Sequence, residues 1–117
     1  MTGSQGRIQD MTQFKDRGQG FESNFKREQE LDFKIVARRN KLLGLWAAGL
    51  LGLDDDSANA YAKEVIMSDF EEPGDDDVLR KVLGDLQGKQ IETSEQLVRK
   101  EMERLRATAR DQIMSEN

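Results

Sequence analysis

The chain has 117 residues, of which 35% are charged, one is proline and none is cysteine or histidine, and its formal net charge is -5 at pH 7. This length suits a single domain, and so little proline with so much charge favours an all-α protein over a sheet of many short strands. Without cysteine or histidine the chain lacks disulfides, the common zinc ligands and the usual general base, so we expect no metal site and no enzyme.

Charge and hydropathy further limit the partners. No stretch reaches the roughly 20 apolar residues that cross a bilayer, so we expect a cytoplasmic protein that is not inserted in a membrane. We also expect it to be a monomer when free. Residues 21–53 hold six basic and four acidic side chains, whereas residues 54–77 hold one basic and ten acidic. An acidic chain repels phosphate backbones, so we expect no nucleic-acid partner.

Residues 1–20 are predicted to form a flexible N-terminal arm, disordered in the free protein. They contain Gly3, Gly6, Gly18 and Gly20 and few apolar side chains, so they cannot bury enough surface to offset the entropy of ordering. Residues 1–10 are expected to be a cloning remnant or the product of an upstream start, outside the functional part.

Residues 21–52 contain no proline and predict one long first helix. At about 1.5 Å per residue it would measure roughly 48 Å, longer than the later helices can cover, so its N-terminal end should project or fray. Its first half has only a sparse apolar stripe that includes Phe25 and Phe33, whereas its second half is apolar almost all round. Trp46 is expected in the core, and the small residues near it should let a neighbouring helix approach.

Three shorter helices are predicted at 57–71, 75–88 and 94–114, which with the first helix make a four-helix bundle over residues 21–114. Pro73 separates the first two of them, and Gly88 ends the next. The aspartates at 54–56 and 75–77 are interpreted as helix caps, not as a cation site. Thr93 with Gln96 predicts a capping box before the last helix.

Arg38, Arg39 and Lys41 form the densest basic run. One interpretation is a solvated helix face that balances the acidic second helix. The other is a docking face for an acidic partner, or a weak site for the phosphates of ADP or ATP, which needs cations converging with backbone donors. Apart from such weak nucleotide binding we expect no cofactor.

Two strings of the sequence resemble the zeta subunit family, which supplies an inhibitor of the rotary ATP synthase in alphaproteobacteria. They are residues 38–52, RRNKLLGLWAAGLLG, and residues 69–78, DFEEPGDDDV, followed by Arg80-Lys81-Val82. The resemblance extends from Met11 to about Ile113. It implies a four-helix bundle whose N-terminal segment inserts as a helix between catalytic subunits of the synthase and blocks rotation in the direction of ATP hydrolysis.

The resemblance also implies the contact residues of this inhibitory arm, which are Phe14, Lys15, Asp16, Arg17, Phe21, Glu22, Phe25 and Lys26. This chain departs from the family pattern at Gly18 and Gly20, where good helix formers are usual. Each interior glycine costs about 1 kcal/mol relative to alanine, so inhibition could be weakened nearly thirtyfold. The alternatives are therefore a nucleotide-responsive bundle or an assembly factor of the synthase, with weak or no inhibition.

Overall fold

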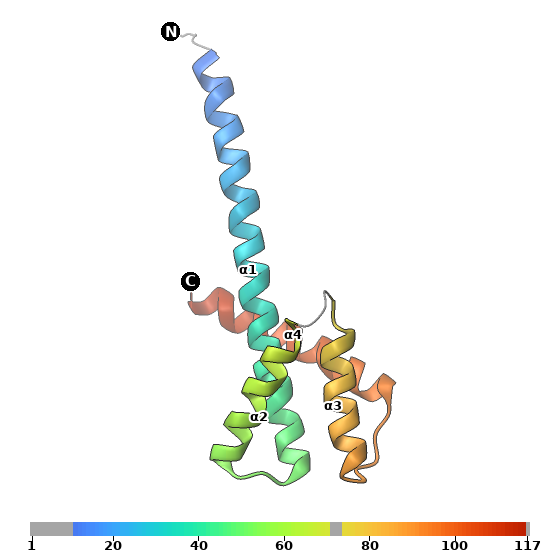
Figure 1. Ribbon diagram of the computed structural model, residues 1–117. Coiled ribbons are helices and arrows are strands. Elements are labelled where there is room, and N and C mark those ends of the chain that lie inside the picture. The colour runs from blue at the N-terminus through green and yellow to red at the C-terminus, as the bar shows by residue number, and fades with distance from the viewer. Residues whose placement is uncertain (1–10, 71–73, 117) are drawn as a thin grey trace. The chain divides into compact units, whose positions relative to one another are not determined.

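The computed structural model describes residues 11–70 and 74–116, with side chains from Phe25 onward. Within these ranges every regular element is an α-helix, and the four predicted helices are present (Figure 1). They are α1 (Met11–Leu51), α2 (Asp55–Ser68), α3 (Asp76–Gly88) and α4 (Glu95–Glu116). The predicted all-α class with four helices and a long first helix is confirmed.

The chain divides into two units, Met1–Phe33 and Lys34–Asn117, and each is described by itself. The second unit contains the packed four helices and begins at Lys34, whereas the bundle was predicted from residue 21. The reason lies in the side chains of residues 25–34, which are exposed except for a half-buried Leu31. They bury too little apolar surface to belong to a core.

The first helix begins at Met11, ten residues before its predicted start at Phe21. Residues 11–20, predicted as part of the flexible arm, are thus helical, and residues 1–10 of that arm lie outside the described residues. Gly18 and Gly20 lie within the helix. Glycine makes a helix less stable but keeps its backbone N–H, so it does not interrupt the hydrogen bonds as proline does.

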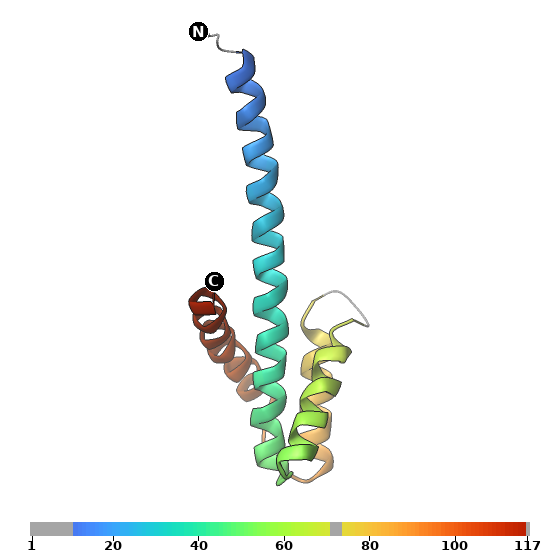
Figure 2. The ribbon, with the colours of Figure 1, turned by 90° about the vertical axis from the view of Figure 1, so that its left-hand side faces the viewer.

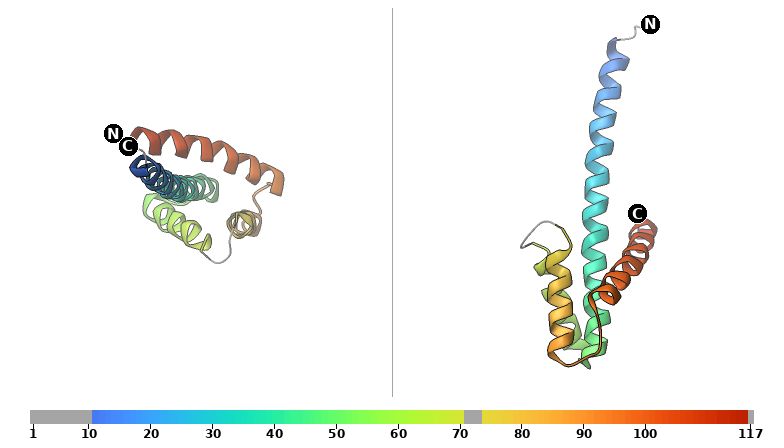
Figure 3. Two further views of the ribbon diagram at one scale, coloured as in Figure 1. Left: turned by 90° about the horizontal axis from the view of Figure 1, so that it is seen from above. Right: turned by 90° about the vertical axis from the view of Figure 1, so that its right-hand side faces the viewer.

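The second unit has one apolar core, to which all four helices contribute. Within this unit α2 and α4 lie on opposite sides of α1, and α3 packs against both of them (Figures 2 and 3). Trp46, which was predicted in the core, is half-buried and packs against the core from its edge. The buried apolar side chains at its centre are Leu43, Ala47, Ala48, Tyr61, Val65, Val78, Leu79, Val82, Leu86, Val98, Met102 and Leu105.

At Gly44 the backbones of α1 and α2 lie very close together. Of the glycines for which the structure describes the surroundings, Gly44 is the one at which an added Cβ would meet another helix. A Cβ built on Gly44 would lie 2.6 Å from the Cα of Ala62 and 3.3 Å from a methyl group of Val65. Only glycine fits without displacing the α2 backbone. The predicted close approach of a neighbouring helix at the small residues is confirmed here, whereas a Cβ on Gly49 would meet nothing within 4 Å.

The two aspartate runs behave differently. Asp54 caps α2, because its side chain accepts a hydrogen bond of 2.8 Å from the backbone N–H of Ser57. Asp75 stands at the same position before α3 but makes no side-chain cap bond, because its carboxylate binds Arg39. The capping interpretation is therefore correct for Asp54 and wrong for Asp75.

At the start of α4 the capping residue is Ser94, whose hydroxyl accepts the backbone N–H of Leu97 at 3.2 Å. The predicted pair of Thr93 and Gln96 was one position too early. Threonine and serine follow each other here and both are good caps, so the pattern alone could not choose between them.

Two helices end in the same hydrogen-bonded turn. After α1 the N–H of Leu53 binds the carbonyl of Ala48, and Gly52 has a φ of 76°. After α3 the N–H of Ile91 binds the carbonyl of Leu86, and the left-handed position is taken by Gln90 with a φ of 63°. This turn favours glycine at the left-handed position, so the end of α3 carries a strain that the end of α1 avoids.

No helix within the described residues combines the length and the apolar character that a membrane crossing requires.

Candidate functional site

The predicted inhibitory arm lies on the N-terminal part of α1. Its members Phe25 and Lys26 are exposed, and 56% of Phe25 is accessible to solvent. The other members also lie within α1, although their side chains fall outside the described part of the chain: Phe14, Lys15, Asp16, Arg17, Phe21 and Glu22. The segment thus offers an aromatic ring and a cation to solvent on one helix.

A second aromatic side chain in this segment, Phe33, was missing from the predicted contact residues. It is 63% exposed, and it follows Phe25 by eight residues on the same helix. At 3.6 residues per turn the two side chains leave the helix about 80° apart. Exposed aromatic rings in pairs are typical of surfaces that bind another protein. The signal was in the sequence, because Phe33 belongs to the sparse apolar stripe.

The structure separates the members of the basic run. Arg38 turns toward α4, where it donates hydrogen bonds to Gln112 at 2.7 Å and to Glu116 at 2.8 Å. Arg39 is buried, with 2% of its side chain exposed, whereas Lys41 is exposed. Neighbours on a helix point in directions about 100° apart, so the run does not form one solvated face, and two of its three cations are used inside the bundle.

Arg39 joins α1 to the start of α3. Its guanidinium donates to the side-chain oxygen of Asn40 at 3.0 and 2.9 Å and to the carboxylate of Asp75 at 2.9 Å. The hydrogen bond from Arg39 lowers the pKa of Asp75. Burial raises the pKa of Asp69, although Arg39 acts in the opposite direction. The two carboxylates near one arginine therefore respond oppositely to their surroundings.

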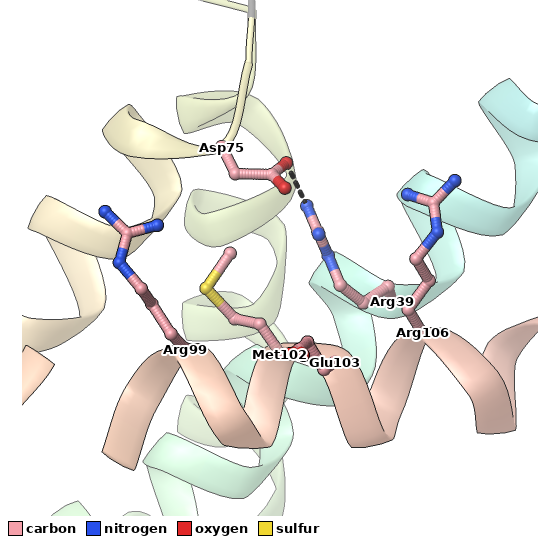
Figure 4. A pocket seen from close by; sticks show the side chains of 6 residues that line it. All are labelled: Arg39, Asp75, Arg99, Met102, Glu103 and Arg106. Carbon is pink, nitrogen blue, oxygen red and sulfur yellow. Dashed lines mark hydrogen bonds and ion pairs between the residues drawn. The ribbon is translucent and has the colours of Figure 1, made fainter. Parts of the chain in front are cut away.

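Beside this ion pair lies a hollow of about 200 Å³ between α1, α3 and α4. Figure 4 shows Arg99 and Arg106 rising from α4 on either side of Met102, on the same side of the helix as the Asp75 carboxylate. The lining residues are Arg39, Asp75, Arg99, Met102, Glu103 and Arg106. Three guanidinium groups in one hollow are suited to an anionic group.

Acidic groups offset part of this positive charge. Arg99 pairs with Glu95 at 3.1 Å and with Asp76 at 3.4 Å, and the hollow itself includes Asp75 and Glu103. Its lining has no nucleophile with an adjacent base. Within the described residues no group of three acidic, histidine or cysteine side chains is arranged to hold a metal ion. The carboxylates therefore reduce the positive charge that an anion would meet in this hollow.

Tyr61 is a further side chain with a polar group that is buried in the bundle. Its hydroxyl donates a hydrogen bond of 2.7 Å to Asp85, and Lys81 binds both Asp85 and Glu64 at 3.1 Å. Burial and the bond to Asp85 raise the pKa of Tyr61 far above its ordinary value. Through this hydrogen bond the Tyr61 hydroxyl joins α2 to α3.

Comparisons with known proteins show what this chain resembles in sequence and in fold. The sequence model described as ATPase inhibitor subunit zeta matches residues 11–112. A solution NMR structure is 55% identical to this chain, with a TM-score of 0.66, and the alignment covers 74% of this chain and 99% of the other. Among curated proteins no match was found.

Proposed function

The chain belongs to the ATPase inhibitor subunit zeta family, and we propose that it binds the catalytic sector of the rotary ATP synthase and inhibits ATP hydrolysis by inserting its N-terminal segment as a helix. A family member of this kind is a regulatory subunit and not an enzyme. The observation that carries the proposal is the match of the family over residues 11–112, which includes the N-terminal part of α1 with its exposed Phe25 and Phe33.

The proposed mechanism is a helix laid into a groove. Phe14, Phe21 and Phe25 occupy apolar pockets of the groove, and each buried ring contributes binding free energy. Five charged side chains interleave with these rings and pair with charges on its walls, namely Lys15, Asp16, Arg17, Glu22 and Lys26. Inhibition is steric, because a helix wedged between catalytic subunits stops the movement that hydrolysis requires.

In this proposal the protein is a monomer when free and becomes peripheral to the inner membrane only through the synthase. We infer that this part of α1, which has no core to support it, is only marginally stable as a helix in the free chain, so binding includes the cost of keeping it helical. Gly18 and Gly20 increase that cost by about 2 kcal/mol in total.

A second candidate is a nucleotide-responsive bundle or an assembly factor. The observation in its favour is the hollow lined by Arg39, Arg99 and Arg106, whose guanidinium groups suit a phosphate. Against this candidate, the guanidinium of Arg39 already forms an ion pair with Asp75, so a phosphate would have to compete with that carboxylate. Only the first candidate uses the exposed phenylalanines of α1.

Titration of the purified chain into its cognate synthase, with ATP hydrolysis as the readout, tests the first candidate. We expect inhibition, its loss when residues 1–24 are removed, and stronger inhibition by Gly18→Ala with Gly20→Ala, up to about thirtyfold. Full hydrolysis at saturating protein would overturn the proposal. Shifts of the backbone amide signals around Arg99 on addition of ADP, lost in Arg99→Gln, would then favour the second candidate.

A further inference from the structure

One ion pair holds α1 close to the point where the bundle stops covering this helix. Toward the N-terminus of α1, Ile35 is the last buried side chain among those described from Phe25 onward. Beyond it Leu31 is half-buried, and the other side chains of residues 25–34 are exposed. Arg38 lies one turn from Ile35 on the same face of the helix, because residues three apart are neighbours. The supported part of α1 therefore begins within a turn of Arg38.

The partners of Arg38 come from the last turns of α4. Its guanidinium donates one hydrogen bond of 2.7 Å to the side-chain oxygen of Gln112 and another of 2.8 Å to the carboxylate of Glu116. A longer contact of 3.2 Å joins the same nitrogen to the second oxygen of that carboxylate. Gln112 and Glu116 are four residues apart and lie on one face of α4. Two side chains of α4 thus hold one side chain of α1.

This ion pair is only partly shielded from water. The side chains of Arg38 and Glu116 are 26% and 56% exposed. A half-exposed pair contributes little to the stability of a whole bundle, which the apolar core provides. Its loss should therefore change the place at which α1 frays more than it changes the free energy of unfolding.

The physics of helix formation gives this place its importance. The helix α1 runs without interruption from the bundle into the segment that carries the proposed inhibitory arm. A helix is unfavourable to start but easy to extend, because its first turn fixes several residues for a single hydrogen bond. The turn held at Ile35 and Arg38 supplies that start. The arm then only has to extend an existing helix.

We propose that Arg38, held by Gln112 and Glu116, is a positioning residue for inhibition, because it fixes the turn of α1 from which the helix of the inhibitory arm extends. This inference rests on the proposed function and adds a control point on the bundle, away from the contact residues of the arm. Without the ion pair the first fixed turn moves toward Leu42, so the unsupported helix becomes about one turn longer. A smaller fraction of the free chain then holds the arm in its helical form, which lowers the apparent affinity.

The test reverses the charge of Glu116 and compares it with a matched ion pair elsewhere in the bundle. Glu116→Lys sets two cations against each other, and Glu64→Lys does the same at Lys81, whose pair with Glu64 has similar exposed fractions of 24% and 61%. Hydrogen exchange of the backbone amides of residues 29–38 in the free chain reports on the helix, and titration of ATP hydrolysis reports on inhibition. Thermal unfolding of both variants should stay within a few degrees of the wild type.

The two variants should differ in both readouts. We expect Glu116→Lys to speed the exchange of these amides by about fivefold and to raise the concentration for half inhibition by a similar factor, since a pair of this exposure is worth about that much. Glu64→Lys should change neither quantity, because Lys81 lies on α3 and does not hold α1.

An exchanged pair shows whether the charge itself is responsible. Arg38→Glu with Glu116→Arg restores opposite charges, and Gln112 can still bind because its amide donates as well as accepts. Both readouts should return to within about twofold of the wild type. Glu116→Gln, which removes the charge and keeps the size, should shift both readouts in the direction of Glu116→Lys by a smaller factor.

The outcomes separate this inference from the proposed function. Wild type that does not inhibit the synthase overturns the proposed function and the positioning role with it, whereas exchange in the free chain still decides whether the pair fixes the helix. That fixing role is overturned by exchange that Glu116→Lys leaves unchanged, by equally fast exchange in Glu64→Lys, or by no recovery in the exchanged pair. Faster exchange with unchanged inhibition overturns the positioning role, because inhibition would then not depend on the turn that Arg38 holds.

Discussion

Two stretches of α1 use their apolar residues in different ways. Phe25 and Phe33 are 56% and 63% exposed, whereas Leu43 and Ala47 further along are fully buried. Both stretches are helical, so helix formation does not separate them. The two stretches differ in the side chains available to pack against them, because the second stretch contacts α2 and the rest of the apolar core. Apolar residues in the second stretch stabilise this chain, and those in the first are available to another protein.

The largest expected effect is on the free energy of unfolding, and it comes from a substitution in the buried stretch of α1. Gly44→Ala places a methyl group against the Cα of Ala62, and we expect a loss of about 3 kcal/mol in the free energy of unfolding because backbone must move. Gly49→Ala is the matched control on the same helix, where the added Cβ meets nothing within 4 Å. It should gain up to about 1 kcal/mol. Denaturant unfolding measures both, and equal values would mean that α1 and α2 do not pack as described.

In the exposed stretch the effect should fall on binding instead of stability. Phe25→Ala with Phe33→Ala should weaken inhibition of the synthase by about 2 kcal/mol, since aromatic anchors dominate such contacts. The free energy of unfolding should change by less than about 0.5 kcal/mol, because both rings are solvated in the free chain. Hydrolysis titrations and chemical unfolding of one preparation decide this, with Leu97→Ala as control. A clear loss of stability would contradict the contrast between the stretches.

The stability of the buried stretch of α1 also depends on the ion pair between Arg39 and Asp75. Asp75→Asn leaves the buried Arg39 without its carboxylate, and because 48% of the Asp75 side chain is exposed we expect a loss of about 1 to 2 kcal/mol, less than for a fully buried pair. The pKa of Asp75 is lowered from 3.8. Its stabilisation is therefore complete above that value and is lost as the pH falls through the lower pKa of the folded state.

The pH dependence offers a control for this ion pair. The stability difference between wild type and Asp75→Asn should be constant near neutral pH and shrink only below about 3.8, the unfolded reference value. Asp69→Asn should act in the opposite direction, because the pKa of Asp69 is raised and its charged form opposes folding. Thermal unfolding from pH 7 to about pH 3 measures both. A difference that shrinks already near pH 6 would rule out Asp75 as the group concerned.

The smallest expected effect concerns the ends of the helices that enclose the core. Gln90→Gly should stabilise the bundle by up to about 1 kcal/mol, because glycine adopts the left-handed conformation without the steric cost that glutamine has. Gly52→Ala at the matching position after α1 should destabilise it. Melting temperatures should move in opposite directions, by several degrees at most. Movement in the same direction would show that backbone conformation does not control these ends.

Much of the fold followed from local patterns. The apolar spacing, Pro73 and Gly88 were enough to find four helices, because these signals act within one or two turns. The start of α1 was missed because glycine lowers helix stability without fixing a boundary. The burial of Arg39 could not be predicted either, since its partner Asp75 is 36 residues away in sequence. For the predicted contact residues, the structure shows that Phe25 is exposed on α1, and Phe33 on the same helix shares that exposure.

The distribution of chromophores follows from the same division of the chain. The single tryptophan, Trp46, and the single tyrosine, Tyr61, both lie in the second unit, and Trp46 is half-buried against the core. Intrinsic fluorescence therefore reports on the bundle alone and should be almost silent when the N-terminal segment changes conformation. Spectroscopy on the unmodified chain separates unfolding of the bundle from events in the arm, and the arm needs a reporter of its own, such as fluorinated phenylalanine.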